Sequence, residues 1–144
     1  MTMTAWIASL DAVVASDTVG LELYDIDVSR WSEALKALKV EHNFVRLEFI
    51  TGVDRGEGEC EVVALLSDAN ARTIAVRARV SSGQVVGSLI DTFPGAAWHE
   101  RELAEMFGVE LSSGPAEHLL LAQDGPEHPL LKSFSLIAEP RARP

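Results

Sequence analysis

Cysteine is almost absent from this chain: Cys60 is the only one among 144 residues, so no disulfide can form within the chain. Iron–sulfur clusters usually take four cysteine ligands, so the chain cannot hold such a cluster alone. Cys60 stands between Glu59 and Glu61, and neighbouring carboxylates raise the pKa of a thiol, which disfavours the nucleophilic thiolate. We therefore interpret Cys60 as an ordinary strand residue.

Basic residues and long apolar runs are also scarce. The chain has 12 Lys and Arg against 22 Asp and Glu, a net charge of −10, so we expect no nucleic-acid binding. No apolar run approaches the roughly 18 residues of a membrane span. Residues 1–17 lack the basic start of a signal peptide and include Asp11, so we expect a short amphipathic helix there. These features predict a cytoplasmic protein that can dock on a membrane complex.

Common catalytic motifs are missing as well: there is no G-x-S-x-G, no phosphate-binding loop and no G-x-G-x-x-G. His99 and Glu102 could join His118 or His128 in a metal site, because zinc takes three or four converging ligands. Their spacing differs from H-E-x-x-H, in which two histidines share one helix face. A small metal-dependent enzyme is thus an alternative function, while the ordinary interpretation of these histidines is surface and capping residues.

What the sequence does contain is a pattern of mixed secondary structure. Alternation predicts four strands, over residues 19–26, 44–53, 61–66 and 73–80, with a turn at 54–58. Helical spacing of Trp31, Leu35 and Leu38 predicts a helix over residues 30–40 with Ser29 as its cap. Residues 84–93 are expected to form a short helical or irregular link.

The same alternation predicts which side chains share a strand face. In the first strand, Val19, Leu21 and Leu23 are expected on one face and Tyr24 on the other. In the second, Val45, Leu47 and Phe49 are expected opposite Arg46 and Glu48. In the fourth, Ile74, Val76, Ala78 and Val80 are expected opposite Arg77 and Arg79. The order of elements predicts an α+β fold, a two-layer sandwich with a mixed, mostly antiparallel sheet and helices on one face.

Two regions follow from this organisation. Residues 1–111 are expected to form the α+β domain, and residues 112–144 an irregular C-terminal tail that prolines interrupt. The tail is rich in leucine for an irregular segment, so it either folds back on the domain or contacts a partner. Folding back is slightly favoured by the residues alone.

The most informative segment is residues 94–108, PGAAWHERELAEMFG. Pro94 and Gly95 interrupt the preceding element, and Gly108 stands where a left-handed residue would end a helix. Between them, charged and apolar side chains alternate: Glu100, Arg101, Glu102, Glu105, Met106 and Phe107. A helix that only covered a core would not need these charges, so we interpret the segment as a contact site; the alternative is a solvated helix face.

This segment resembles the signature region of the thirty-kilodalton subunit of NADH:quinone oxidoreductase (respiratory complex I). The family shows Pro-Gly-Ala-x-Trp, then Glu-Arg-Glu, an acidic residue, two apolar residues and glycine. Here these are Pro94-Gly95-Ala96, Trp98, Glu100-Arg101-Glu102, Glu105, Met106-Phe107 and Gly108. The stretches FITGVDR and ECEVVALL, and the late Glu127-His128-Pro129-Leu130, also resemble the family, and the resemblance spans roughly residues 19–136.

The resemblance implies an accessory subunit of the cytoplasmic arm, peripheral on the plasma membrane, with no cofactor of its own. FMN, iron–sulfur clusters and quinone would be carried by other subunits, its partners in the membrane-bound complex. It implies a partner interface formed by Glu100, Arg101, Glu102, Glu105, Met106, Phe107, Gly108, His128 and Pro129. Arg101 would bridge carboxylates within or across that interface, and its replacement by alanine would weaken assembly but not folding.

The tail departs from the family pattern. After the motif the family has His-Pro followed by arginines, whereas this chain has Gly114-Pro115 and then Glu117-His118-Leu119-Leu120. After the late His-Pro it has Leu131-Lys132-Ser133-Phe134 instead of a more basic run. An equivalent subunit of an energy-converting hydrogenase is therefore a second alternative.

Overall fold

The computed structural model describes residues 2–9, 12–16, 20–114 and 117–136. The chain begins with helix α1 (Met3–Ser9), followed by strand β1 (Val13–Ser16). The prediction of one N-terminal helix was therefore right only for its first half. Trp6 of α1 is fully buried, with its ring 5.4 Å from that of Tyr24 in an edge-to-face contact. Residues 10, 11 and 17–19, including the predicted Val19, lie outside the described residues.

A five-stranded sheet forms one layer of the molecule. It contains β1, β2 (Glu22–Ile26), β3 (Arg46–Gly56), β4 (Glu59–Ser67) and β5 (Thr73–Ser81) in the order β1-β2-β5-β4-β3. The β2–β5 pair is parallel, and the other three pairs are antiparallel. The sheet is therefore mixed and mostly antiparallel, as the sequence predicted.

The predicted faces are confirmed for β5 but not for β2 and β3. In β5, Ile74, Val76, Ala78 and Val80 are buried. In β2, Tyr24 and Ile26 are buried while Leu23 is half-buried, the reverse of the prediction. In β3, the register shifts between Leu47, which pairs with Leu66, and Phe49, which pairs with Leu65. This bulge places Leu47 and Phe49 on opposite faces, since Leu65 and Leu66 are consecutive strand residues.

The helices cover one face of the sheet. A single 3₁₀ turn, η1 (Val28–Arg30), leads into α2 (Trp31–His42), whose Trp31, Ala34, Leu35 and Leu38 are buried. Asp27 caps this turn by accepting hydrogen bonds from the backbone N–H and the hydroxyl of Ser29, so the predicted cap Ser29 is itself the donor. The helix ends at Asn43, whose φ of 60° is left-handed.

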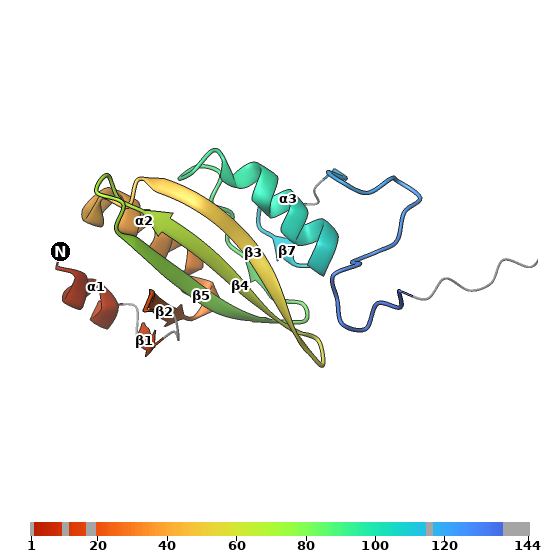
Figure 1. The fold of residues 1–144 in the computed structure, drawn as a ribbon, viewed down its shortest axis with the longest axis horizontal. Helices are drawn as coiled ribbons and strands as arrows, with labels where there is room; N and C mark the ends of the chain where they lie inside the picture. Colours follow the sequence, from red (N-terminus) through yellow and green to blue (C-terminus); the bar gives the residue numbers. More distant parts are fainter. Residues whose placement is uncertain (1, 10–11, 17–19, 115–116, 137–144) are drawn as a thin grey trace, which may run out of the picture.

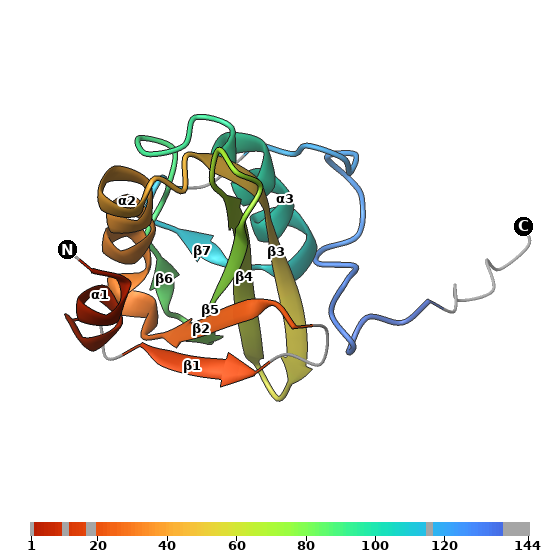
Figure 2. The ribbon, with the colours of Figure 1, turned by 60° about the vertical axis from the view of Figure 1, so that its left-hand side comes forward.

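The remaining elements complete this layer. Strand β6 (Val85–Val86) pairs in parallel with β7 (Glu110–Leu111), and α3 (Ala96–Phe107) connects them. The predicted link 84–93 therefore contains a short strand, which sequence alternation could not show in two residues. Figure 2 shows the β6–β7 pair between α2 and α3. In Figure 1, β3, β4 and β5 lie in front of α2, with the chain after β7 running past α3. The two-layer α+β fold is thus confirmed.

Candidate protein interface around helix α3

Helix α3 begins and ends where the sequence predicted. It spans Ala96–Phe107, directly after Pro94-Gly95. Gly108 has a φ of 69°, and its N–H donates to the carbonyl of Ala104 at 2.9 Å, which closes the last turn. The helix contacts β3 closely, because Gly52 has no side chain to separate them. This fixes the direction in which each charged side chain of α3 points.

The side chain of Glu100 points into the protein and forms hydrogen bonds that stabilise the fold. It is 3% exposed, and its Oε1 accepts a 2.6 Å hydrogen bond from the N–H of Leu89. Its Oε2 accepts a 2.8 Å bond from the hydroxyl of Ser88. Both partners belong to the link after β6, so Glu100 ties that link to α3. The carboxylate is occupied within the chain, and Glu100 is not part of the interface proposed below.

Arg101 binds the tail through carbonyl groups. Its Nε and Nη2 donate to the carbonyls of Glu117 and His118 at 3.1 and 2.7 Å. The guanidinium also lies over the ring of Trp98, 5.4 Å from its centroid. Sequence reasoning assigned carboxylate acceptors to Arg101, whereas in this structure the acceptors are two successive backbone carbonyls. Arginine suits this role because its rigid fork presents several donors at once.

Glu105 is the centre of the contacts between α3 and the tail. Its carboxylate accepts bonds from the N–H groups of Leu119, Leu120 and Leu121 at 2.9 to 3.1 Å, and its Oε1 lies 3.0 Å from His118 Nδ1. Desolvation raises the pKa of the Glu105 carboxyl, but these hydrogen bonds outweigh it and hold the pKa below the usual 4.5. The carboxylate is therefore charged at neutral pH and fixes three successive backbone amides.

Replacing Glu105 with glutamine should loosen the tail without unfolding the domain. Glutamine keeps one acceptor oxygen but loses the charge, so it cannot satisfy three amides and a histidine. We expect hydrogen exchange at Leu119–Leu121 to accelerate by about tenfold or more. The control is Glu102→Gln, an exposed carboxylate on the same helix, which should leave these amides protected. Equal exchange in both variants would contradict this role of Glu105.

The end of α3 holds a second part of the tail. His128 Nδ1 lies 3.1 Å from the carbonyl oxygen of Glu105, and the N–H of Leu130 donates to the carbonyl of Met106 at 3.2 Å. A Cβ on Gly108 would lie 2.9 Å from the His128 ring, so only glycine lets this ring approach the backbone so closely. The left-handed φ of Gly108 also favours glycine at this position. Met106 is buried and Pro129 half-buried.

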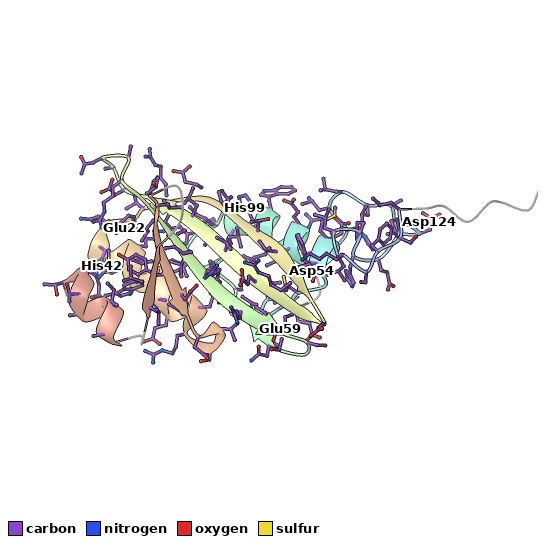
Figure 3. The ribbon with its side chains drawn as sticks, turned by 60° about the horizontal axis from the view of Figure 1, so that its bottom comes forward. Glu22, His42, Asp54, Glu59, His99 and Asp124 are labelled. Carbon is purple, nitrogen blue, oxygen red and sulfur yellow. The ribbon has the colours of Figure 1, made fainter. Side chains whose placement is uncertain are left out.

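Asp54 is an anchor that sequence reasoning placed only in a turn. Its Oδ2 accepts a 2.6 Å bond from the N–H of Lys132, and its Oδ1 accepts one from Gly56. These two backbone bonds lower the pKa of the Asp54 carboxyl. Figure 3 shows Asp54 near the tip of the β3–β4 hairpin, with Glu59 on the other strand. The tail is thereby attached to the hairpin as well as to α3.

A cavity lies where the hairpin tip, the end of α3 and the tail meet. Its volume is about 490 Å³, and it is lined in part by Asp54, Cys60, Gly108, His128 and Lys132. Cys60 is buried in β4, and desolvation is the main reason that its pKa is raised, with Asp54 and Glu61 adding to the effect. The raised pKa of Cys60 agrees with the prediction from the sequence. Burial of the thiol, rather than the neighbouring carboxylates, is its main cause.

The residues proposed for a metal site do not converge. His118 contacts Glu105, and His128 packs on Gly108. His99 and Glu102 both lie on α3. Within the described ranges, no group of three or more His, Cys, Asp and Glu side chains could hold a metal ion. The metal-dependent alternative therefore lacks its site in the described part of the chain.

The outward surface of α3 and the tail carries large apolar side chains. Trp98 is 62% exposed, Leu120 64% and Leu130 53%. The sequence placed all three in the family motif or the leucine-rich tail, but the predicted interface set did not include them. We call Trp98, Leu120 and Leu130 the α3–tail surface.

The structure is an α+β domain with a tail bound across one helix and exposed apolar side chains on both. The family model for the respiratory-chain NADH dehydrogenase 30 Kd subunit matches residues 24–140. The chain belongs to this family, as the motif in α3 predicted.

Curated relatives agree with the family. The chain is 31% identical over 138 residues to the corresponding NADH-quinone oxidoreductase subunit of Rhodopseudomonas palustris (strain TIE-1), covering 90% of this chain and 68% of the relative. It is 35% identical to that of Phenylobacterium zucineum (strain HLK1) over 108 residues, which cover 72% of this chain and 52% of that protein. The chain thus spans between half and about two thirds of the length of these relatives.

A solved structure shares the fold. It is a chain in the structure of the membrane-bound sulfane sulfur reductase (MBS), an archaeal respiratory membrane complex, with a TM-score of 0.74 and 22% identity. The match covers 93% of this chain and 84% of that one. At this identity the likeness establishes the fold. Among the described residues, no helix has both the length and the apolar character needed to cross a membrane.

Proposed function

We propose that this chain is a non-catalytic assembly subunit in the peripheral arm of a proton-pumping NADH:quinone oxidoreductase, on the cytoplasmic side of the plasma membrane. It packs against the iron–sulfur and quinone-site subunits. The FMN, iron–sulfur clusters and quinone of the complex are carried by subunits other than this chain. Family membership supports the complex, and the names of the curated relatives favour it over an energy-converting hydrogenase.

The observation that carries this proposal is the α3–tail surface. Trp98, Leu120 and Leu130 are exposed apolar side chains on segments that hydrogen bonds hold in place. Exposed apolar side chains on an ordered surface are typical of a binding site, and ordering before binding reduces the entropy lost on association. Arg101 and Glu105 of α3 hold the tail in place, because both bind its backbone groups. This supports a structural rather than a catalytic role for the charged residues of the helix.

Within this interface the predicted residues have two roles. Arg101, Glu105, Gly108 and His128 position the tail. Glu102 is exposed and available to a basic group of a partner. Half-buried Phe107 packs against Gly52 of β3, and Pro129 is half-buried in the tail. The partner therefore contacts a composite surface of helix and tail rather than the helix alone.

Leu120→Asp and Leu130→Asp test this surface in the tagged full chain. Each adds a charge to an exposed apolar position, so the isolated protein should melt at an unchanged temperature. Recovery of the iron–sulfur subunits from detergent-solubilised membranes should fall about tenfold or more. The control is Val40→Asp, at a 69% exposed position on α2. Equal losses in all three variants, or none, would contradict an interface at the α3–tail surface.

A further inference from the structure

Two buried nitrogen atoms where α1 meets α2 have no hydrogen-bond partner. They are Trp6 Nε1 and His42 Nε2, and among the described residues no other buried side-chain nitrogen or oxygen atom is left without one. The two rings contact each other edge to face, with their centroids 6.1 Å apart and their planes at 70°. Because native proteins pair most buried polar groups, two unpaired atoms in adjoining rings call for a common explanation.

The protonation state of His42 decides whether these two nitrogens are compatible. The indole N–H of Trp6 is only a donor, whereas Nε2 of a neutral imidazole is an acceptor when the proton is on Nδ1. Neutral His42 therefore places an acceptor in the ring next to the indole. In the protonated imidazole both nitrogens are donors, so a second buried donor and a positive charge would lie beside the indole N–H.

The charged groups around His42 give a positive charge there little support. Glu41, its neighbour on α2, favours the charged imidazole, whereas Arg72 and the amino terminus oppose it. The nearest carboxylate on β2, Glu22, is already bound by Arg72 at 2.7 and 3.0 Å and by the hydroxyl of Tyr24. Helix α1 has no charged side chain. Desolvation is the largest influence, and it holds the pKa of His42 below the usual 6.5.

Helix α1 depends on Trp6 for its attachment to the domain. It has seven residues, of which Trp6 alone is buried, and a helix this short is not stable in water by itself. Figures 1 and 2 show α1 at the edge of the domain, next to α2. A cavity of about 230 Å³, lined in part by Trp6, Ser9 and Ala37, lies between the two helices, so their packing is incomplete. Displacement of the Trp6 ring would therefore release α1.

We propose that the contact between Trp6 and His42 is a pH-responsive latch, in which protonation of His42 releases α1 from the domain. Because burial favours the neutral imidazole, the contribution of His42 to the docking of α1 is complete above about pH 6.5. It is lost as the pH falls through the lower pKa of the folded state. Release would uncover the ring of Tyr24, which Trp6 contacts. The latch is independent of the proposed function, since α1 lies outside the α3–tail surface.

NMR spectra of the ¹⁵N-labelled full chain test the latch through its three tryptophans, Trp6, Trp31 and Trp98. Between about pH 8 and pH 5, the indole N–H signal of Trp6 should change with the same midpoint as the imidazole of His42. The indole signals of Trp31 and Trp98 should persist, because the rest of the domain stays folded. The backbone N–H of Trp6, which donates to the carbonyl of Thr2 at 2.9 Å, should lose exchange protection several-fold over the same range.

A substitution of His42 and a matched control separate the latch from general effects of acid. His42→Gln should abolish the Trp6 transition, because the glutamine amide is a neutral acceptor that does not titrate. His99→Gln, which replaces a histidine on α3, should leave the midpoint unchanged. The indole signals of Trp31 and Trp98 report whether each variant folds. If His42→Gln does not fold, the coincidence of the two midpoints in the wild type still decides the question.

Four results would overturn the latch. These are a Trp6 signal that stays unchanged down to about pH 5, a Trp6 midpoint that differs from that of His42, an equal transition in folded His42→Gln, and a simultaneous change of all three indole signals. The last of these would mean that acid unfolds the whole domain rather than releasing α1.

Discussion

Replacing Glu100 with alanine should lower the free energy of unfolding by about 3 kcal/mol, one of the two largest effects expected of a single substitution here. The alanine removes both acceptors at once, so the buried N–H of Leu89 and the hydroxyl of Ser88 lose their partner. A buried donor left without an acceptor costs its full desolvation energy. The link after β6 should detach from α3 as a result.

Two further substitutions separate this effect from a general effect of charge on α3. Glu100→Gln keeps an acceptor for Leu89, so we expect a loss of about 1 to 2 kcal/mol. Glu102→Ala removes an exposed carboxylate two residues along the helix and should change stability by less than about 0.5 kcal/mol. Urea denaturation followed by tryptophan fluorescence measures all three. Similar losses for Glu100→Ala and Glu102→Ala would contradict the buried role.

Replacing Gly52 with alanine should lower the free energy of unfolding by about 2 kcal/mol through overpacking. A Cβ at this position would lie 2.7 Å from Phe107 Cδ2, 2.8 Å from Phe107 Cγ and 3.0 Å from Leu103 Cδ1. The Phe107 ring is constrained near its base, so relief requires a shift of α3 away from β3. Because α3 carries the tail, that shift should also weaken co-purification with partner subunits.

Gly95→Ala is the matched control for this overpacking. A Cβ at Gly95 meets nothing within 4 Å, and the φ of −64° suits alanine. We expect thermal melting to show no loss, or a gain of about 0.5 kcal/mol from a stiffer unfolded chain. Phe107→Leu combined with Gly52→Ala should recover part of the loss, since the smaller side chain opens space. A Gly52→Ala protein as stable as the wild type would contradict the close contact of α3 and β3.

The elements that the sequence predicted well are those set by local interactions. Helix α3 follows from Pro94-Gly95, the 12 residues of the helix itself and Gly108, all neighbours in the chain. The face of β5 follows from a regular alternation that no bulge interrupts. In β3, by contrast, the bulge after Leu47 depends on pairing with β4, so alternation alone placed Phe49 on the wrong face.

The directions of side chains on α3 were less predictable. Glu100 lies four residues after Ala96 and three before Leu103, which places it on the buried stripe of the helix. That spacing could have identified Glu100 as an inward residue. The contacts of Glu105 with Leu119–Leu121 could not have been found in this way, because they join residues 14 to 16 positions apart through an irregular tail.

The most direct test of the proposed assembly role is affinity purification of the tagged chain from membranes of its native host in mild detergent, with mass spectrometry of the associated proteins. The account predicts recovery of the iron–sulfur and quinone-site subunits of an NADH:quinone oxidoreductase, in amounts comparable with the tagged chain. Recovery of the chain alone, from the soluble fraction, would contradict it. That result would mean that the α3–tail surface remains exposed without a partner.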